Sequence, residues 1–196
     1  MKKTDFVRTF VSKDSYKEKE EREGVCIVHL DGVLNDELGA YECVECSMPV
    51  GEYSEAAVNE AYAAWKVATA NRRIAQAKRE VLKKIEDYDT SPAVNGFILN
   101  GQRVWLDFEL RDRVYQGNER LQRIGRTDTT LWLGKQCYNL SIEQAQNIIS
   151  HIEAYAKDCY NVTAAHKKAV SELATIEEVE KYDITAGYPA QLKMEV

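Results

Sequence analysis

The chain has 196 residues, of which 44% are hydrophobic and 30% charged, and its 26 basic and 32 acidic side chains give a net charge of −6. This length supports one medium domain or two small ones with a real core, and the acidic balance argues against a general nucleic-acid binder. The longest apolar runs, such as residues 96–99, fall far short of the roughly 20 residues that cross a bilayer, and the first residues build no apolar leader. We therefore predict neither a membrane contact nor a secretory signal.

The N-terminal residues 1–53 are predicted to form a small β-rich unit. Between its first two strands, Ser12 or Asp14 could cap a short charged helix that ends at Glu23. A unit this short buries little surface, so we expect it to lean on another part of the chain. Its three strands are predicted from β-branched and aromatic residues at 4–11, 25–30 and 41–46.

A single long helix is predicted over residues 54–88, connecting the N-terminal unit to a C-terminal domain. Ser54 is a good N-cap, and nothing breaks the helical pattern before Asp87. The large apolar side chains form two separate stripes, so we expect the middle of the helix to be solvated. The stripes are Val58, Tyr62 and Trp65, then Ile74, Val81, Leu82, Ile85 and Tyr88.

The C-terminal domain, residues 89–196, is predicted to contain two β-hairpins. Asn100-Gly101 between apolar residues is a strong signal for a type I′ turn, and 129–140 has the pattern of a second hairpin. Asp107 is a candidate N-cap for a helix over 108–124 between the hairpins.

Capping boxes open two further helices of the C-terminal domain. Ser141 and Gln144 begin a helix that extends to about Ala174, and Thr175 and Glu178 begin a short one that ends near Tyr182. Apolar residues recur along the longer helix at alternating spacings of three and four, an apolar row that must face another element. The row is Ala145, Ile148, Ile152, Tyr155, Cys159, Val162, His166, Ala169 and Leu173. The predicted fold is therefore α+β: a small N-terminal β unit, a long connecting helix, and two hairpins packed on a long helix.

The five cysteines suggest a reducing compartment, because their number is odd. Cys26 and His29, followed by Cys43 and Cys46, supply on paper the four ligands of a zinc site. Residues three apart in a strand point to opposite faces, however, so only bulges or tight turns could bring the four together. The alternative is that these are buried strand cysteines.

No motif in the sequence predicts an enzyme. The three histidines are dispersed, and glycine-rich phosphate loops, HExxH and GxSxG are lacking. The basic residues of 72–84 could contact nucleic acid, but Arg72, Arg79 and Lys83 lie opposite Ile74, Val81 and Ile85, as on an ordinary solvated helix face. We predict no catalytic, cofactor-binding or metal-binding residues.

Aromatic side chains are the candidate contact residues. Trp105 and Trp132 hold corresponding places in the two hairpins, where we expect them to pack on the long final helix. Homo-oligomerisation is expected through the connecting helix or the apolar row, which present more apolar surface than a small domain covers. The predicted interface residues are Trp65, Trp105, Trp132, Tyr155 and His166.

From about Ile85 onward the sequence resembles an uncharacterised domain family of bacteriophage and prophage genes, found beside or within tail-fibre and tail-associated proteins. The resemblance implies a virion component or assembly factor, assembled in the host cytoplasm, that binds other phage structural proteins. The family has no assigned activity, so it carries over no catalytic residues. The tail of the chain is similar to the form seen in phages of gut Bacteroidetes. The segments that carry the resemblance are 94–107, 129–134, 155–163 and 175–189.

Overall fold

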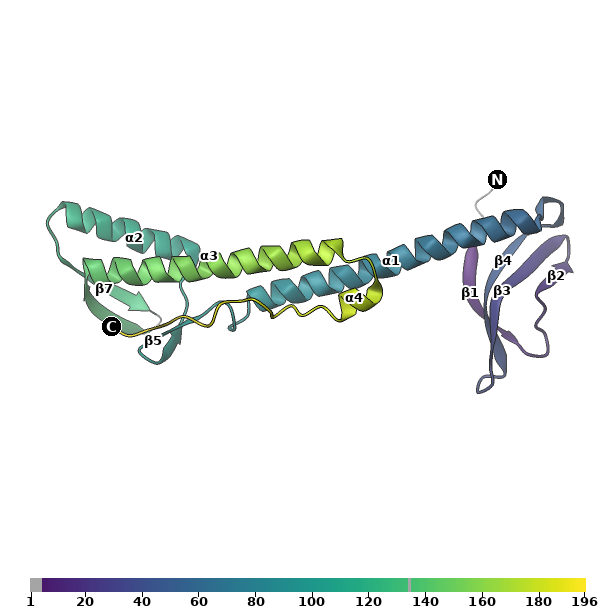
Figure 1. Cartoon of the computed structure of the whole chain (residues 1–196), viewed down its shortest axis with the longest axis horizontal. Coiled ribbons are helices and arrows are strands. Elements are labelled where there is room, and N and C mark those ends of the chain that lie inside the picture. The colour runs from purple at the N-terminus through teal and green to yellow at the C-terminus, as the bar shows by residue number, and fades with distance from the viewer. Residues whose placement is uncertain (1–4, 134) are drawn as a thin grey trace. The chain divides into compact units, whose positions relative to one another are not determined.

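The computed structural model describes residues 5–133 and 135–196 and confirms the α+β class (Figure 1). Thr4 and Gly134, which belong to the first predicted strand and the second predicted hairpin, lie outside the described residues. The chain forms two compact units, of which the first ends at Arg73 and the second begins at Ile74. This boundary lies inside helix α1 (Glu55–Asp89), so the predicted connecting helix contributes one half to each unit.

The first unit is a four-stranded antiparallel sheet covered on one face by the first half of α1. The core between sheet and helix holds Cys26, Val28, Cys46 and Val58. Phe6 of the first strand also packs against the helix, on Tyr62 and Trp65. The strands are β1 (Phe6–Ser12), β2 (Lys19–Arg22), β3 (Val25–Asn35) and β4 (Ala40–Pro49) in the order β1-β4-β3-β2, and a 3-10 turn, η1 (Val50–Glu52), leads into α1.

The predicted charged helix before Gly24 is wrong, because Lys19–Arg22 is strand β2, paired antiparallel with β3. Glu23 and Gly24 both have positive φ, 52° and 80°, as the two central residues of a tight hairpin turn require. Pairing with β3 satisfies the backbone of this charged segment, which has too few apolar residues to hold a helix against the sheet.

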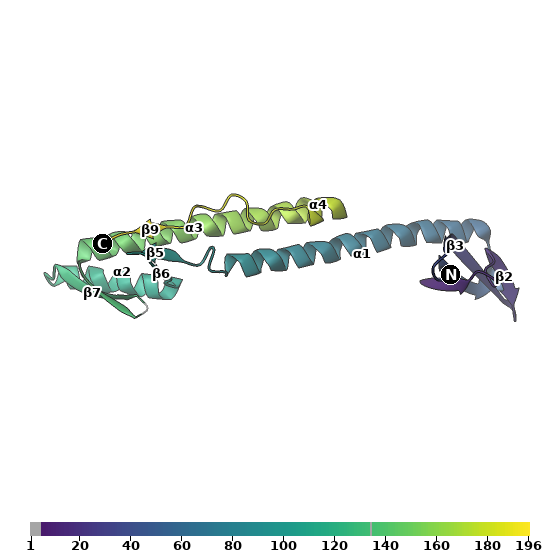
Figure 2. The ribbon, with the colours of Figure 1, turned by 90° about the horizontal axis from the view of Figure 1, so that it is seen from below.

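The second unit combines two β-hairpins with helices, and Figure 2 shows the same elements from a second direction. The predicted turn at Asn100-Gly101 is confirmed, with φ values of 48° and 75°. Asp107 caps its helix through the Leu110 amide at 2.8 Å, and both predicted capping boxes are present. The elements are β5 (Phe97–Leu99), β6 (Gln102–Val104), α2 (Phe108–Arg123), β7 (Asp128–Leu133), β8 (Gln136–Ser141), α3 (Ile142–Glu172), α4 (Ile176–Glu180) and β9 (Lys193–Met194).

The end of the chain returns along α3 and closes the second unit (Figures 1 and 2). Strand β9 pairs in parallel with β5, giving the order β6-β5-β9. Both hairpins pack on α3 around a core of Phe97, Leu99, Leu106, Leu131, Leu133, Ile148, Ile149 and Ile152. The second half of α1 packs through Val81 and Ile85 on Val170 of α3 and Val179 of α4.

The buried row of α3 departs from the predicted one after Cys159. Thr163 and Val170 are buried there, whereas Val162 and Ala169 are only half-buried. A strict alternation of three and four has a period of 3.5 residues, but a straight helix has 3.6, so the buried face moves forward by one residue. This shift places a hydroxyl group, that of Thr163, in the row.

Candidate protein-binding groove

A groove of about 460 Å³ lies between α2 and α3 in the second unit. Phe108 and Tyr115 lie two turns apart on α2 and line one wall, while Ile149 and Ala154 of α3 contribute to the other. Phe108 is 65% exposed, an unusual state for a large aromatic residue. The groove therefore offers apolar surface that the chain itself leaves uncovered.

A buried arginine links the two walls of this groove. Arg111 is 6% exposed, and its Nε donates to Glu153 Oε2 at 2.7 Å while its Nη1 donates to the Leu106 carbonyl at 2.6 Å. The guanidinium also lies 5.5 Å from the ring centre of Trp105 and 5.9 Å from that of Phe108. Held by Glu153 of α3, the Leu106 carbonyl and two aromatic rings, Arg111 fixes the shape of the groove more than it adds free charge.

The rim of the groove is balanced in charge. Asp112 and Glu153 are acidic and Lys157 is basic, and the buried Arg111 is paired with Glu153. Apolar walls beside charges of both signs match the composition of protein contact sites, which are enriched in aromatic and arginine side chains. Two of the polar groups that line the groove are already engaged within the chain: Glu153 accepts from Arg111 at 2.7 Å, and the Ser150 hydroxyl donates to the Gln146 carbonyl at 2.8 Å. The geometry of the groove therefore favours binding.

The inner face of α2 is unusually polar. Its fully buried residues are Arg111 and Asn118, seven residues apart and therefore on one side of the helix. The Asn118 Nδ2 group is buried without a hydrogen-bond partner among the described residues. An unpaired buried amide costs about 1–3 kcal/mol, so α2 is held in place less tightly than an apolar helix would be.

Two of the predicted interface residues are half-buried. Trp65 stacks on Tyr62 and contacts Phe6, with ring centres 5.7 and 5.8 Å apart, in the core of the first unit. Trp105 packs against the core of the second unit and against Arg111, as predicted for this hairpin.

Trp132 differs from Trp105, because it is 63% exposed. The prediction that it packs on the long helix is wrong: Leu131 and Leu133 point to the core, and strand alternation turns Trp132 outward. The exposed Trp132 therefore adds to the uncovered apolar surface of the second unit.

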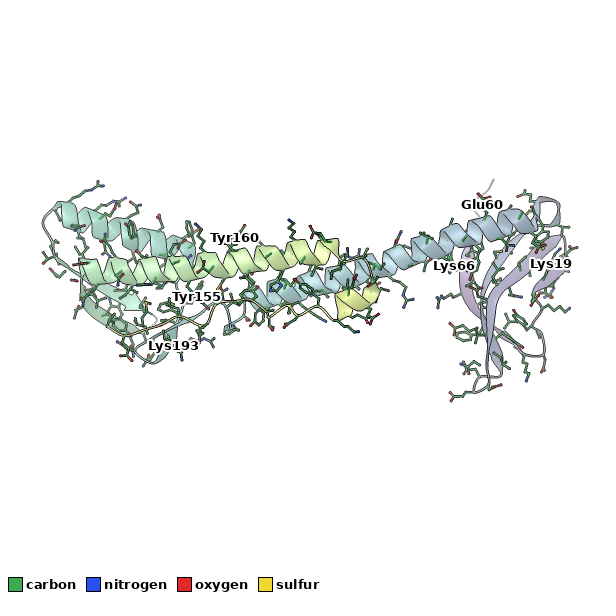
Figure 3. The ribbon with its side chains drawn as sticks, viewed as in Figure 1. Lys19, Glu60, Lys66, Tyr155, Tyr160 and Lys193 are labelled. Carbon is green, nitrogen blue, oxygen red and sulfur yellow. The ribbon has the colours of Figure 1, made fainter. Side chains whose placement is uncertain are left out.

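The other two predicted interface residues, Tyr155 and His166, are buried inside the second unit and contact this same chain. Tyr155 and Tyr160 leave α3 on different sides, and Tyr160 is the exposed one (Figure 3). Burial and a hydrogen bond to Cys159 raise the pKa of Tyr155 to about 12. Both residues thus belong to the interior that the returning C-terminal segment covers.

A polar network surrounds His166. Its Nε2 lies 2.8 Å from the Ala186 carbonyl, which can only accept, so Nε2 carries a proton. In the neutral ring Nδ1 then accepts from the Tyr182 hydroxyl at 2.8 Å. Nearby, the Thr163 hydroxyl donates to Asp89 at 2.7 Å and lies 2.7 Å from the Tyr188 hydroxyl. These bonds fasten α1 and the C-terminal segment to α3.

The four residues of the hypothetical zinc site do not converge. Cys26 and Cys46 lie in the core under α1, whereas His29 and Cys43 lie on the opposite face of the sheet, as the spacing of three implies. Among residues 5–133 and 135–196, no group of three or more His, Cys, Asp and Glu side chains is arranged to hold a metal ion.

His29 and Cys43 instead belong to an aromatic cluster on the uncovered face of the first sheet. Tyr16 stacks on Tyr41, with ring centres 4.0 Å apart, and lies 5.6 Å from the His29 ring. His29 Nδ1 donates to the Lys17 carbonyl at 2.5 Å, and Nε2 lies 3.4 Å from Glu45. Burial, followed by the charge of Glu45, raises the pKa of the Cys43 thiol, which makes it a poor nucleophile.

The basic side chains of α1 follow the predicted solvated face. Arg72, Arg79 and Lys83 are exposed, while Val81 and Ile85 are buried. Within the second unit Lys78 donates to the Ser171 carbonyl at 2.7 Å, so it takes part in packing α1 on α3.

The sequence interpretation missed the groove, although part of its signal was present. Phe108 and Tyr115 are spaced as i and i+7 on a helix whose other positions are mostly charged or polar, which marks an apolar line on that helix. What no local pattern shows is that Glu153, 42 residues after Arg111, lies across from it.

No helix among the described residues combines the length and apolar character that crossing a membrane requires. Comparison of the chain with protein-family models, with curated proteins and with solved structures finds no match in any of the three.

Proposed function

We propose that this chain is a non-enzymatic, tail-associated structural or assembly protein of a phage particle, which acts by binding other virion proteins. Its resemblance to phage tail-associated proteins lies in residues of the second unit, which also carries the groove. The observation that supports the proposal most is the exposed aromatic surface there: Phe108 at the groove and Trp132 on the outer face of the β7–β8 hairpin, 65% and 63% exposed.

The partner should present an apolar side chain flanked by charges of both signs. Such a side chain would fill the space between Phe108, Tyr115 and Ile149, while Asp112 and Lys157 at the rim pair with its neighbours. A second copy of the chain is a further proposed partner.

The proposal can be tested by measuring which proteins are present in purified particles of the phage whose genome encodes this chain. We expect mass spectrometry to find the chain in the particles, and Phe108→Ala to lower its copy number. Tyr160→Ala, which removes an exposed aromatic outside the groove, is the matched control and should leave the copy number unchanged. Particles that lack the chain and assemble normally without its gene would overturn the proposal.

The neighbouring genes give a second test of the same proposal. We expect a cluster of tail or baseplate genes around the gene for this chain. A metabolic operon would contradict the proposed function.

Nucleic-acid binding through 72–84 is the weaker alternative. Glu80 interrupts the cations of this segment, and Lys78 donates to the Ser171 carbonyl. Binding through this face would have to weaken steeply with salt, so retention on nucleic acid at increasing salt concentration separates the two functions.

A further inference from the structure

The first sheet has two edge strands, and they differ in chemistry. β2 is four residues long with the sequence Lys-Glu-Glu-Arg, a short charged edge of the kind that blocks further strand pairing. β1 is seven residues long, Phe-Val-Arg-Thr-Phe-Val-Ser, and contains neither proline nor a bulge. Among the described residues no strand pairs with its outer edge.

The side chains of β1 are apolar and exposed on both faces of the sheet. Phe10, on the face that α1 covers, and Val7, on the opposite face, are each 59% exposed. A long apolar edge strand that remains uncovered is a template for another strand.

The hydrogen bonds of β1 show which of its backbone groups are free. The Lys13 amide donates to the Gly39 carbonyl at 3.0 Å, one pair beyond the register Ser12↔Ala40. Because hydrogen-bonded and non-hydrogen-bonded pairs alternate in an antiparallel ladder, Val7, Thr9 and Val11 direct their amides and carbonyls toward β4. The amides and carbonyls of the other four residues therefore point outward from the sheet: Phe6, Arg8, Phe10 and Ser12.

We infer that β1 pairs antiparallel with β1 of a second copy of this chain, with the two-fold axis at Thr9. In this register the outward groups of Arg8 meet those of the partner's Phe10, and Phe6 meets the partner's Ser12, so every free backbone group of the strand finds a partner. The two sheets join into one sheet of eight strands.

The side chains complement one another in the same register. Arg8 lies directly opposite the partner's Phe10, an arrangement in which a guanidinium covers an exposed aromatic ring. Val7 lies opposite the partner's Val11 on the other face, and Thr9 lies opposite its own copy. An axis at Arg8 would instead place two arginines face to face, and an axis at Phe10 would leave Phe6 beyond the end of the partner strand.

This inference rests on the self-association in the proposed function, and charge reversal at Thr9 tests it separately. Two lysines directly opposite each other repel, as do two glutamates, whereas a lysine opposite a glutamate attracts. Light scattering at about 200 µM suits an interface of this small size. We expect the unmodified protein to be a dimer, with twice the 22.3-kDa mass of one chain. Thr9→Lys alone and Thr9→Glu alone should be monomers, and an equimolar mixture of the two variants should again form dimers.

Val33→Lys is the matched control, because Val33 is also exposed on this sheet, at 67%, but lies on β3. It should leave the dimer intact, and so should Phe108→Ala in the groove. A single-mass unmodified protein would overturn both self-association and the β1 pairing. Dimers that persist in Thr9→Lys would overturn the β1 pairing alone.

A cross-link checks the register without relying on charge. Facing Thr9 residues would form a non-hydrogen-bonded pair with Cα atoms about 4.5 Å apart, which a disulfide can span. In a Cys137→Ser background, which removes the exposed native thiol, Thr9→Cys should give a covalent dimer on oxidation and Phe10→Cys should not. A dimer cross-linked by Phe10→Cys and not by Thr9→Cys would refute the axis at Thr9.

Discussion

Strand β5 of the second unit and strand β1 of the first unit differ in the number of strands that pair with them. In the second unit, β5 is covered on one side by β6 and on the other by β9, a strand that arrives from the end of the chain 94 residues later. In the first unit β1 keeps an open edge. Strand β5 thus finds both of its neighbours within the chain, whereas β1 finds only one, and we place the proposed contact with a second copy at β1.

The units also differ in how far apart in sequence their contacts are. In the first, the hairpins β2–β3 and β3–β4 are local, and the longer-range pairing of β1 with β4 joins residues such as Phe6 and Cys46. The second depends on distant pairs, such as Asp89 with Thr163 and Ile98 with Lys193. A substitution that shortens a buried side chain should therefore lower the free energy of unfolding of its own unit only. The loss should be greater in the unit with the larger core.

Ile152→Ala should give the largest effect. Ile152 is fully buried where both hairpins meet α3, so the substitution leaves a cavity and should lower the free energy of unfolding of the second unit by about 2–5 kcal/mol. Hydrogen exchange resolved by peptide is the measurement. Protection should fall in β5 and α3 and stay unchanged in β3 and β4; an equal loss in both units would show that they unfold as one.

Gly32→Ala is the corresponding change in the first unit. A Cβ at Gly32 would lie 2.7 Å from Cζ of Tyr16 and closer still to its hydroxyl, so the ring must leave its stack on Tyr41. We expect a loss of about 1–3 kcal/mol, confined to the first unit, measured by denaturant unfolding. In a Tyr16→Ala background the same substitution should cost much less, and an equal cost there would disprove the steric cause.

Tyr62→Phe should have a smaller effect with a distinctive pH dependence. The Tyr62 hydroxyl donates to Asp31 at 2.8 Å, so its removal should cost about 1 kcal/mol at neutral pH. Burial and this hydrogen bond raise the pKa of Tyr62 from 10.0 to about 12.

The folded state thus holds this proton more tightly than the unfolded chain, so the stabilisation is complete below pH 10 and is lost as the pH rises toward 12. The free energy of unfolding of the first unit, measured from pH 10 to 12, should fall in the unmodified protein and fall less in Tyr62→Phe. Identical pH profiles would contradict the assignment to Tyr62.

Features set by a few neighbouring residues could be predicted from the sequence. The turn at Asn100-Gly101, the cap at Asp107 and the capping box at Ser141 depend on local backbone chemistry, and the structure confirms all three. Strand β2 was missed because its charged residues have no intrinsic preference that reveals the β3 partner, although Glu23-Gly24 was a usable turn signal.

The candidate contact residues were harder to predict, because burial is decided by distant segments. Tyr155 and His166 are covered by residues near Tyr188 and Ala186 that return from the end of the chain. The outward direction of Trp132 could have been predicted from the sequence. Leu131 and Leu133 on either side of it already indicate the buried face of the strand, so Trp132 must lie on the other face.

Asn100→Gly should give the smallest effect and tests how the second unit closes its sheet. The Asn100 side chain holds the last residue from both sides: its Oδ1 accepts from the Val196 amide at 3.0 Å, and its Nδ2 donates to the Val196 carbonyl at 3.3 Å. Glycine keeps the positive φ that the turn requires, so the substitution removes the side-chain bonds without straining the backbone.

Because these bonds are exposed to water, the free energy of unfolding should fall by about 1 kcal/mol or less. The sensitive measurement is hydrogen exchange at Val196, which should become much faster. The Ile98 and Asn100 amides, which donate to the carbonyls of Leu192 and Met194 at 2.8 and 3.0 Å, should stay protected. Loss of protection at Ile98 as well would mean that β9 is held by its terminal clamp and not by its ladder with β5, and β5 would then, like β1, have a paired strand on one side only.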